Sequence, residues 1–169
     1  SIDLLTKGNY SHYEFLGAVE NFFTKCAPAV FMGWSNLNFD RRMFHFNFFK
    51  GNRYPYATHS SPNSEHDGLH IARAAQTLNS ETLKTELTEA GNPSLALESL
   101  SRMQGFDTSA SHTAYVDAQN SLKVLRIIKD KHKENWDTFL KTSTKTSVET
   151  FLKNEGIYSI FENVKGRNM

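Results

Sequence analysis

The sequence predicts a mainly α-helical protein, and three observations support this class. Serine and threonine residues that can cap a helix precede runs in which apolar residues recur every three or four positions. Glycine or proline follows several of these runs, as at Gly105 and Pro28. The one segment whose apolar residues alternate lies in the first third of the chain. We therefore expect a helical, bundle-like domain with a short β-hairpin or an irregular aromatic segment in its first third.

Length and composition limit how the chain is organised. Its 169 residues suit a single domain over residues 1–169, with an aromatic-rich part at 1–60 and a helical part at 61–169. Its 13 phenylalanines supply enough apolar area for a folded core. Because the chain begins at Ser1, without a methionine or a leader segment, we expect it to be excised from a larger protein.

The charge balance and the single cysteine narrow the class of protein. Lys and Arg number 19 against 18 Asp and Glu, and the formal charge of +1 argues against binding a polyanion through bulk charge. No apolar run reaches the roughly 20 residues of a membrane span. The one cysteine cannot form an intramolecular disulfide, which fits a reducing compartment. We expect an intracellular protein, cytoplasmic or, if it is a bacterial effector, delivered into a host cytosol.

The first helix is predicted to begin after Ser11. Ser11 and Glu14 form the pattern of a capping box, in which the serine hydroxyl and the glutamate carboxylate satisfy early backbone N–H groups. Apolar residues then recur at helical spacing, and Pro28 limits the helix.

Residues 30–56 have a different pattern. The phenylalanines within residues 44–48 alternate with His45 and Asn47, which predicts a strand with one buried face. Residues 30–32 are the candidate partner strand of a hairpin. The alternative is an irregular aromatic segment that packs on helices.

Three shorter helices are predicted next. The first covers residues 66–78 and is capped by Ser64 or Asn63. A short helix over residues 80–90 follows, ended by a Gly-Asn-Pro sequence, and a third helix covers residues 94–103.

The longest predicted helix starts near Ser111 and carries one apolar face. Its length suggests a break within residues 131–135. Residues 146–149 have the pattern of a second capping box, which opens a helix that ends at residues 154–156. A last short helix is expected over residues 157–164.

The chemistry-bearing residues gather between His45 and His70, where four of the seven histidines lie. On the predicted helix, His66 and His70 stand one turn apart, and Arg73 joins the same face. Two such histidines can ligate a metal ion as neutral imidazoles. With the arginine, they can instead bind a phosphate and transfer protons without a metal. A structural role, in which the imidazoles only bond the backbone, is the third alternative.

The order His66-x-x-x-His70-x-x-Arg73, with Gly68-Leu69 between the histidines, resembles the H-G-L-x-H-x-x-R segment in the phosphodiesterase domain of the SidE-type bacterial effectors. The resemblance covers about ten residues. It implies a helical fold related to the HD-type phosphohydrolases and a His–Glu–His site that cleaves the phosphodiester of ADP-ribosylated ubiquitin. His66 would then match a catalytic histidine, with His70 and Arg73 as its helix neighbours.

The resemblance also implies a catalytic acid downstream. Residues 105–109 stand where those effectors have a Gly-Arg-Asp-Asp-Glu run, so that Asp107 would be the acid, although Ser109 replaces the glutamate. Glu65 is the alternative acid. A second, remote histidine would also be needed, and His112 or His132 is the candidate by elimination.

Arg41 and Arg42, with aromatic residues nearby, could bind single-stranded nucleic acid by stacking and charge. The net charge near zero argues against this function, and we interpret these aromatic residues as core. Arg53 and His59 precede the histidine segment in the chain, where they could border a phosphate site.

Together these patterns predict a phosphodiesterase or phosphohydrolase with a His-centred site that acts on a phosphate-containing or ADP-ribose-type substrate. The predicted catalytic residues are His66, His70, Asp107 and His112, and the predicted substrate-binding residues are Arg73, Arg53 and His59. No cofactor is expected, although a metal ion at His66 and His70 would define a metal-dependent hydrolase as one alternative. The other alternative is a non-catalytic helical module that binds a protein partner. Nucleic acid is not expected as a partner.

Overall fold

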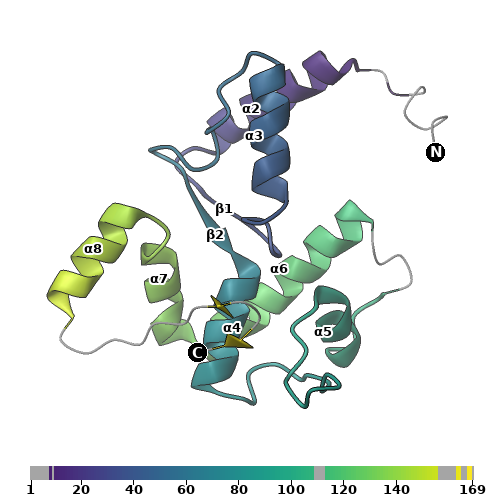
Figure 1. Ribbon diagram of the computed structural model, residues 1–169, viewed down its shortest axis with the longest axis vertical. Helices are drawn as coiled ribbons and strands as arrows, with labels where there is room; N and C mark the ends of the chain where they lie inside the picture. The colour runs from purple at the N-terminus through teal and green to yellow at the C-terminus, as the bar shows by residue number, and fades with distance from the viewer. Residues whose placement is uncertain (1–7, 9, 109–112, 156–162, 165–166, 169) are drawn as a thin grey trace. The chain divides into compact units, whose positions relative to one another are not determined.

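A computed structural model describes residues 8, 10–108, 113–155, 163–164 and 167–168 (Figure 1). The prediction of a mainly α-helical protein is confirmed, and the described residues also contain two small two-stranded sheets, β1 with β2 and β3 with β4. The elements in chain order are α2 (His12–Cys26), β1 (Val30–Gly33), α3 (Asp40–Lys50), β2 (Ser64–Asp67), α4 (Gly68–Leu78), α5 (Leu97–Met103), α6 (Ala114–Lys131), α7 (Lys133–Lys141), α8 (Lys145–Asn154), β3 (Asn163–Val164) and β4 (Arg167–Asn168). No helix among these described elements is long and apolar enough to cross a membrane.

The chain forms two compact units. Unit 1 comprises Ser1–Phe31 and Leu37–Glu65, and unit 2 comprises Met32–Asn36 and His66–Met169. The division passes through both β1 and β2. Each unit has its own hydrophobic core. The expectation of one single domain stays a prediction.

The core of unit 1 is aromatic. Leu16, Phe23 and Phe48 are buried, and Phe31 and Phe44 pack against them. The Phe23 ring centroid lies 4.9 Å from that of Phe31 and 5.5 Å from that of Phe44, both in edge-to-face geometry. Each edge-to-face pair contributes about 0.5–1.5 kcal/mol of stability beyond that from the burial of its two rings.

Helix α2 begins as predicted. The Ser11 hydroxyl accepts from the Glu14 backbone N–H at 3.2 Å, and a Glu14 carboxylate oxygen accepts from the Ser11 N–H at 2.8 Å. This is the capping box read from the sequence. The helix ends at Cys26, two residues before Pro28.

The strand predicted over residues 44–48 is wrong, and so is its irregular alternative, because α3 covers the segment. Phe44 and Phe48 are four positions apart and both contribute to the core, as helical spacing requires. Phe46 lies between them and is 59% exposed. The apolar residues of this segment therefore fit both the period of two of a strand and the period of 3.6 of a helix. The burial of each side chain shows that the helix is correct.

Residues 30–32 do form a strand, β1, but its partner is β2 and not a neighbouring hairpin strand. The two strands run parallel. The backbone N–H of Ser64 donates to the carbonyl of Ala29 at 2.9 Å, and the side chain of Asn63 accepts from the Ala29 N–H at 3.0 Å. The residues of β2 are all polar, so the sequence does not predict a strand there. The strand forms by pairing with β1, whose residues lie far from β2 in the chain.

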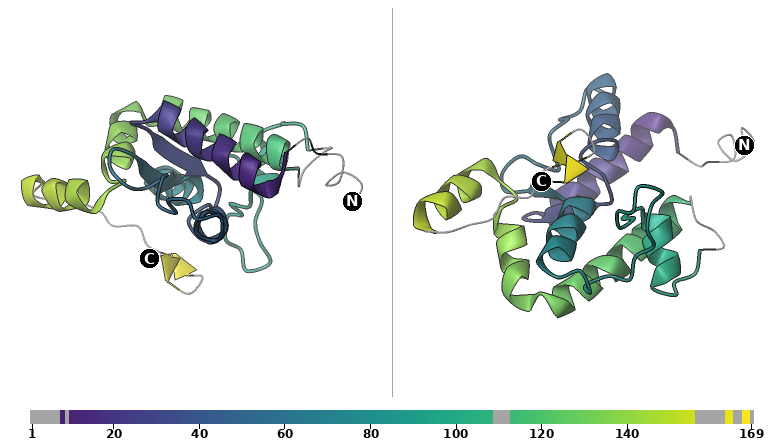
Figure 2. Two further views of the ribbon diagram at one scale, coloured as in Figure 1. Left: turned by 90° about the horizontal axis from the view of Figure 1, so that it is seen from above. Right: turned by 60° about the horizontal axis from the view of Figure 1, so that its bottom comes forward.

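In unit 2, α4, α5 and α7 each contact α6 (Figure 2). The fully buried hydrophobic side chains here are small or branched aliphatic: Ile71, Ala72, Ala75, Leu83, Leu100, Val124 and Ile128. The predicted apolar face of α6 is thus confirmed at Leu125 and Ile128, whereas Tyr115 and Leu122 are exposed.

The helix predicted over residues 80–90 is wrong. Residues 79–96 form turns and an isolated β-bridge between Leu87 and Pro93. The Asn79 side chain accepts from the Glu81 N–H at 2.9 Å, which builds a turn in place of a helix start. Helix α5 begins only at Leu97, and Gly105 follows it with a φ of 76°, as predicted for a residue just past a helix end.

The predicted break in the longest helix is confirmed at His132, which separates α6 from α7. A hydrogen bond of 2.6 Å joins the buried His132 ring to the hydroxyl of Thr82. The second capping box exists, but Thr144 and Ser147 form it, two residues earlier than predicted. The helix predicted over residues 157–164 lies mostly outside the described residues, and Asn163–Val164 belongs to β3.

Candidate functional site

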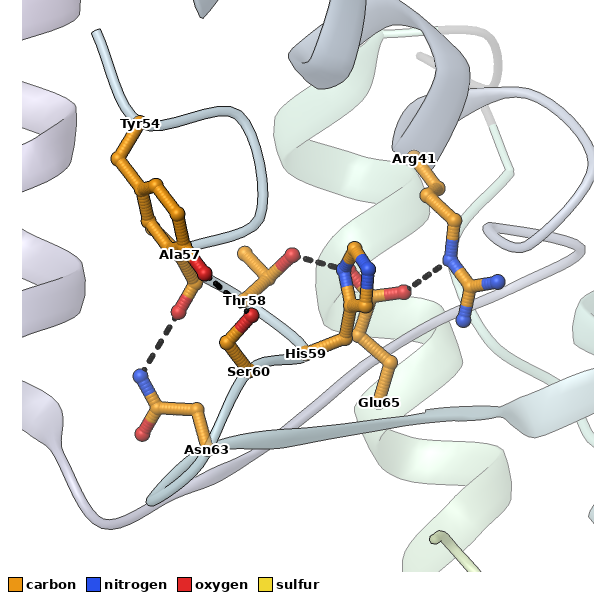
Figure 3. Close-up of polar contacts among 8 residues, drawn as sticks. All are labelled: Arg41, Tyr54, Ala57, Thr58, His59, Ser60, Asn63 and Glu65. Carbon is orange, nitrogen blue, oxygen red and sulfur yellow. Dashed lines mark hydrogen bonds and ion pairs between the residues drawn. The ribbon is translucent and has the colours of Figure 1, made fainter. Parts of the chain in front are cut away.

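Glu65 is the centre of the most developed polar cluster in unit 1 (Figure 3). It lies in β2 with only 4% of its side chain exposed. Arg41 of α3 donates to one carboxylate oxygen, and the hydroxyl of Thr58 donates to the other. A buried carboxylate is costly unless it is paired in this way, so these contacts fix β2, α3 and the loop at residue 58 to one another.

Two histidines border this cluster. His59 Nδ1 lies 3.9 Å from a Glu65 oxygen, and the His59 and His45 ring centroids are 4.9 Å apart. Burial lowers the pKa of His59; Arg41 and His45 lower it further, and Glu65 opposes them. His59 Nδ1 and His45 Nε2 have no hydrogen-bond partner among the described residues. His59, which the sequence suggested as a substrate-binding residue, therefore belongs to a packed cluster.

Arg53, also predicted to bind substrate, is held inside unit 1. Its guanidinium pairs with Glu20 at 2.6 Å and donates to the Tyr13 carbonyl at 3.2 Å. The same group lies 4.3 Å from the centroid of the Tyr13 ring. These contacts use donors on both terminal nitrogens of Arg53, whereas its buried Nε has no hydrogen-bond partner among the described residues.

His66 and His70 do not share a helix face, so the geometric basis of the predicted site is wrong. His66 lies in β2, because the side chain of Asp67 accepts from the Leu69 N–H at 2.9 Å and caps α4. Ser64 and Asn63, the predicted caps, lie before the strand's end. His70 is exposed on α4, and Arg73 is half-buried on the same helix.

The environment of His66 suits a structural role. Its Nδ1 accepts from the Asp67 N–H at 2.9 Å. Burial lowers its pKa, and the charge of His70 lowers it further, while a hydrogen bond to the Phe139 backbone opposes both. Hydrogen bonds from the imidazole to backbone groups fit the third alternative raised for this histidine, a structural role.

The other two predicted catalytic residues are not brought to His66 by any described contact. Asp107 is exposed in the loop after α5, where its carbonyl accepts from the Asn120 side chain at 3.2 Å. His112 lies outside the described residues. Within the described part of the chain, no three His, Cys, Asp or Glu side chains gather as metal ligands would. The assignment of catalytic roles to these residues stays a prediction.

Sequence reasoning missed one feature of α3. Phe39, Phe46 and Phe49, interpreted with their neighbours as core, are 66%, 59% and 75% exposed. Phe46 lies on the side of α3 opposite Phe44 and Phe48, whereas Phe39 precedes the helix and Phe49 flanks its core side. The signal was present, because residues 39, 43, 46 and 50 follow helical spacing as well as the core residues do.

The fold of the chain is similar to that of part of exonuclease I. Solved structures of Escherichia coli exonuclease I superimpose with TM-scores of 0.76 and 0.74, at 22% and 21% identity. The matched regions cover 82% and 83% of this chain and, in both cases, 30% of the longer neighbour. One neighbour is a complex with a dA16 oligonucleotide, and the other is a complex of exonuclease I with SSB-Ct. No family model matches the chain.

Sequence similarity leads to the same proteins. Exodeoxyribonuclease I of Haemophilus influenzae is 26% identical over 119 residues, which is 70% of this chain and 25% of the relative. The Escherichia coli enzyme is 27% identical over 128 residues, 73% of this chain and 26% of the relative. The chain thus spans about a quarter of the length of these curated relatives.

These comparisons correct three expectations. The resemblance to SidE-type effector domains is wrong, because relatives and structural neighbours alike are exonuclease I. The His-centred phosphodiesterase acting on an ADP-ribose-type substrate is contradicted for the same reason, and neither alternative, the interaction module or the His66–His70 metallohydrolase, is favoured. The exclusion of nucleic acid is also contradicted, since the structural neighbours are complexes with oligonucleotides.

Proposed function

We propose that the chain is part of a DNA-acting nuclease similar to exodeoxyribonuclease I. The observation that carries the proposal is the agreement of two comparisons, a TM-score of 0.76 over 82% of the chain and 26% identity over 70% of it. In this function the protein is a hydrolase of phosphodiester bonds in DNA, and it works inside the cell, where that substrate is found. Because the relatives are several times longer than the matched segment, other segments contribute to the whole activity.

Hydrolysis of a phosphodiester needs groups that activate water and stabilise the charge on phosphorus. Carboxylates can do so by holding divalent cations, which prefer oxygen ligands. Asp40 and Asp117 each lie in the first turn of a helix, α3 and α6, with at least part of the residue exposed. His112, predicted as a catalytic residue, is five positions before Asp117 and can serve as a general base. The described residues form no complete metal centre.

The test is degradation of DNA oligonucleotides that carry a fluorescent label at one end or the other. We expect wild-type protein to shorten single-stranded DNA, with the two labels revealing the direction. Asp117→Asn and His112→Ala should each lower the rate by at least about a hundredfold, as removal of a catalytic acid or base does. Asp137→Asn, which removes an exposed carboxylate on α7, is the matched control and should retain the rate. Absence of DNA degradation by the wild-type protein, with or without Mg²⁺, would refute the proposal.

A further inference from the structure

One segment of unit 1, residues 54–60, lies between two fixed points of the chain. Before it, Arg53 forms an ion pair with α2. After it, the side chain of Asn63 accepts a hydrogen bond from the backbone before β1. Between these points, the hydroxyl of Thr58 donates to the buried carboxylate of Glu65 in β2 (Figure 3). The ends of the segment are therefore anchored independently of its middle.

Apolar burial holds this segment only weakly. Ala57 packs against the aromatic core of unit 1, while Tyr54 and Tyr56 are 55% and 47% exposed. A segment that buries few apolar side chains can open without unfolding of the structure around it. The attachment of residues 54–60 to α3 and β2 therefore depends mainly on polar contacts.

Two histidines in contact attach the segment to α3. The ring centroids of His59 and His45 are 4.9 Å apart, and the Tyr56 ring meets both edge-on, at 5.3 Å from His45 and 5.4 Å from His59. His59 Nδ1 and His45 Nε2 are buried and have no hydrogen-bond partner among the described residues. A proton on either nitrogen would place a positive charge in this buried contact, which is costly unless an acceptor moves toward it.

The groups that face His59 act on its charge in opposite directions. Arg41 and His45 face it from α3, Glu65 from β2 and Tyr56 from its own segment. Glu65 lies 3.9 Å from Nδ1, beyond hydrogen-bond distance, and its carboxylate is already paired with Arg41. Burial is the largest cause that lowers the pKa of His59, Arg41 and His45 lower it further, and the attraction of Glu65 does not offset them.

We propose that the contact of His45 with His59 is a pH-sensitive switch, in which uptake of a proton detaches residues 54–60 from α3 while the rest of unit 1 stays folded. This inference goes beyond the nuclease function and does not depend on it. Because the pKa of His59 in the folded protein lies below its ordinary value of 6.5, the stability that this contact gives the segment is fully present above about pH 6.5. It is lost as the pH falls.

Amide hydrogen exchange, followed residue by residue by NMR at several pH values between 7.5 and 5.5, tests the switch. The reporter is the Ser60 N–H, which donates to the Tyr56 carbonyl at 2.9 Å. Its protection factor, corrected for the intrinsic pH dependence of exchange, should fall at least about threefold over this range. The Gly51 N–H, which donates to the Asn47 carbonyl at 2.9 Å in the same unit, should keep its protection.

Three variants identify the group that takes up the proton. In His59→Gln the protection of Ser60 should not change with pH, because the titrating group is gone. His45→Gln removes a charge that lowers the pKa of His59, so the fall should be smaller than in wild type. His12→Gln is the matched control, because His12 is exposed at the start of α2, and it should behave as wild type does. Unfolding curves verify that each variant is folded.

Four results would overturn the proposal. Protection of Ser60 that is constant in wild type means that no proton acts on the segment, and an equal fall in wild type and His59→Gln means that the proton binds elsewhere. A rise on acidification means that Glu65 captures the proton and strengthens the contact. An equal fall at Gly51 means that all of unit 1 opens. If His59→Gln does not fold, His45→Gln decides, and a fall as large as in wild type refutes the switch.

Discussion

His66 shows how a residue that the sequence places on a helix can lie in a strand of the fold. Its ring is half-buried between backbone groups, and burial is the largest cause of its lowered pKa. Asp67 is the N-cap of α4, which begins at Gly68, so His66 lies before the helix, in β2. A ten-residue resemblance could not reveal this, since it assumed that both histidines were in one helix.

The lowered pKa of His66 makes stability depend on pH. The pKa of His66 in the folded protein lies below the ordinary value of 6.5, so below that pH the unfolded chain takes up more protons than the folded chain. The contribution of His66 is therefore fully present above about pH 6.5 and is lost as the pH falls. We expect the free energy of unfolding, measured by urea titration between pH 7.5 and 5, to fall less in His66→Gln than in wild type. His70→Gln, on the exposed side of α4, is the control, and an equal fall in His66→Gln and wild type would contradict the assignment.

Gly68 is a second residue whose role follows from close packing. A Cβ atom at this position would lie 3.0 Å from the Gly33 carbonyl oxygen and 3.2 Å from the Trp34 ring. Alanine would favour the helix, but neither the carbonyl nor the ring can easily move away. We expect Gly68→Ala to lower the free energy of unfolding by about 1–3 kcal/mol. Gly17→Ala meets only the movable end of the Arg53 side chain, so it should cost less, and the reverse order would contradict this account.

At the scale of the element, α3 is the clearest case of neighbouring side chains in different environments. Phe48 is buried in the core of unit 1, and Phe49, its neighbour, is 75% exposed. We expect Phe48→Ala to lower the free energy of unfolding by about 3–5 kcal/mol, and Phe49→Ala to change it by less than about 0.5 kcal/mol. Chemical denaturation of both variants measures the difference. Similar costs for the two would mean that α3 is not oriented as described.

Strand β2 depends on α3 through the buried Glu65. Arg41→Met removes a donor and leaves the carboxylate with Thr58 and the more distant His59. Arg41 is partly exposed, so water recovers some of the loss, and we expect a cost of about 2 kcal/mol. The double variant Arg41→Met/Glu65→Met removes the charge as well and should cost less than the sum of the two single changes. Additive costs would show that the pair is not coupled.

At the scale of the whole molecule, the sequence predicted features that depend on neighbouring residues better than features that depend on contacts between distant residues. The capping box at Ser11, the helix end at Gly105 and the break at His132 depend on neighbours in sequence, and all three are confirmed. Helix α3 was missed because its phenylalanines fit both periods. Strand β2 was missed because its pairing with β1 is made across more than thirty residues.

The candidate site was less predictable than the fold. Histidines drew attention because their chemistry is versatile. Among the described ones, His66 and His132 are hydrogen-bonded, His45 and His59 pack against each other, and His12 and His70 are exposed. The exposed phenylalanines Phe39, Phe46 and Phe49 were interpreted as core because composition alone cannot tell an outward phenylalanine from an inward one.

The central claim is that this chain belongs to a nuclease acting on DNA and not to a phosphodiesterase acting on ADP-ribose-type substrates. The most direct measurement incubates one preparation of the protein, with Mg²⁺, with a labelled single-stranded oligonucleotide and, in parallel, with ADP-ribose. The account predicts release of nucleotides or short fragments from the oligonucleotide while ADP-ribose stays intact. Cleavage of ADP-ribose with an undegraded oligonucleotide would contradict it.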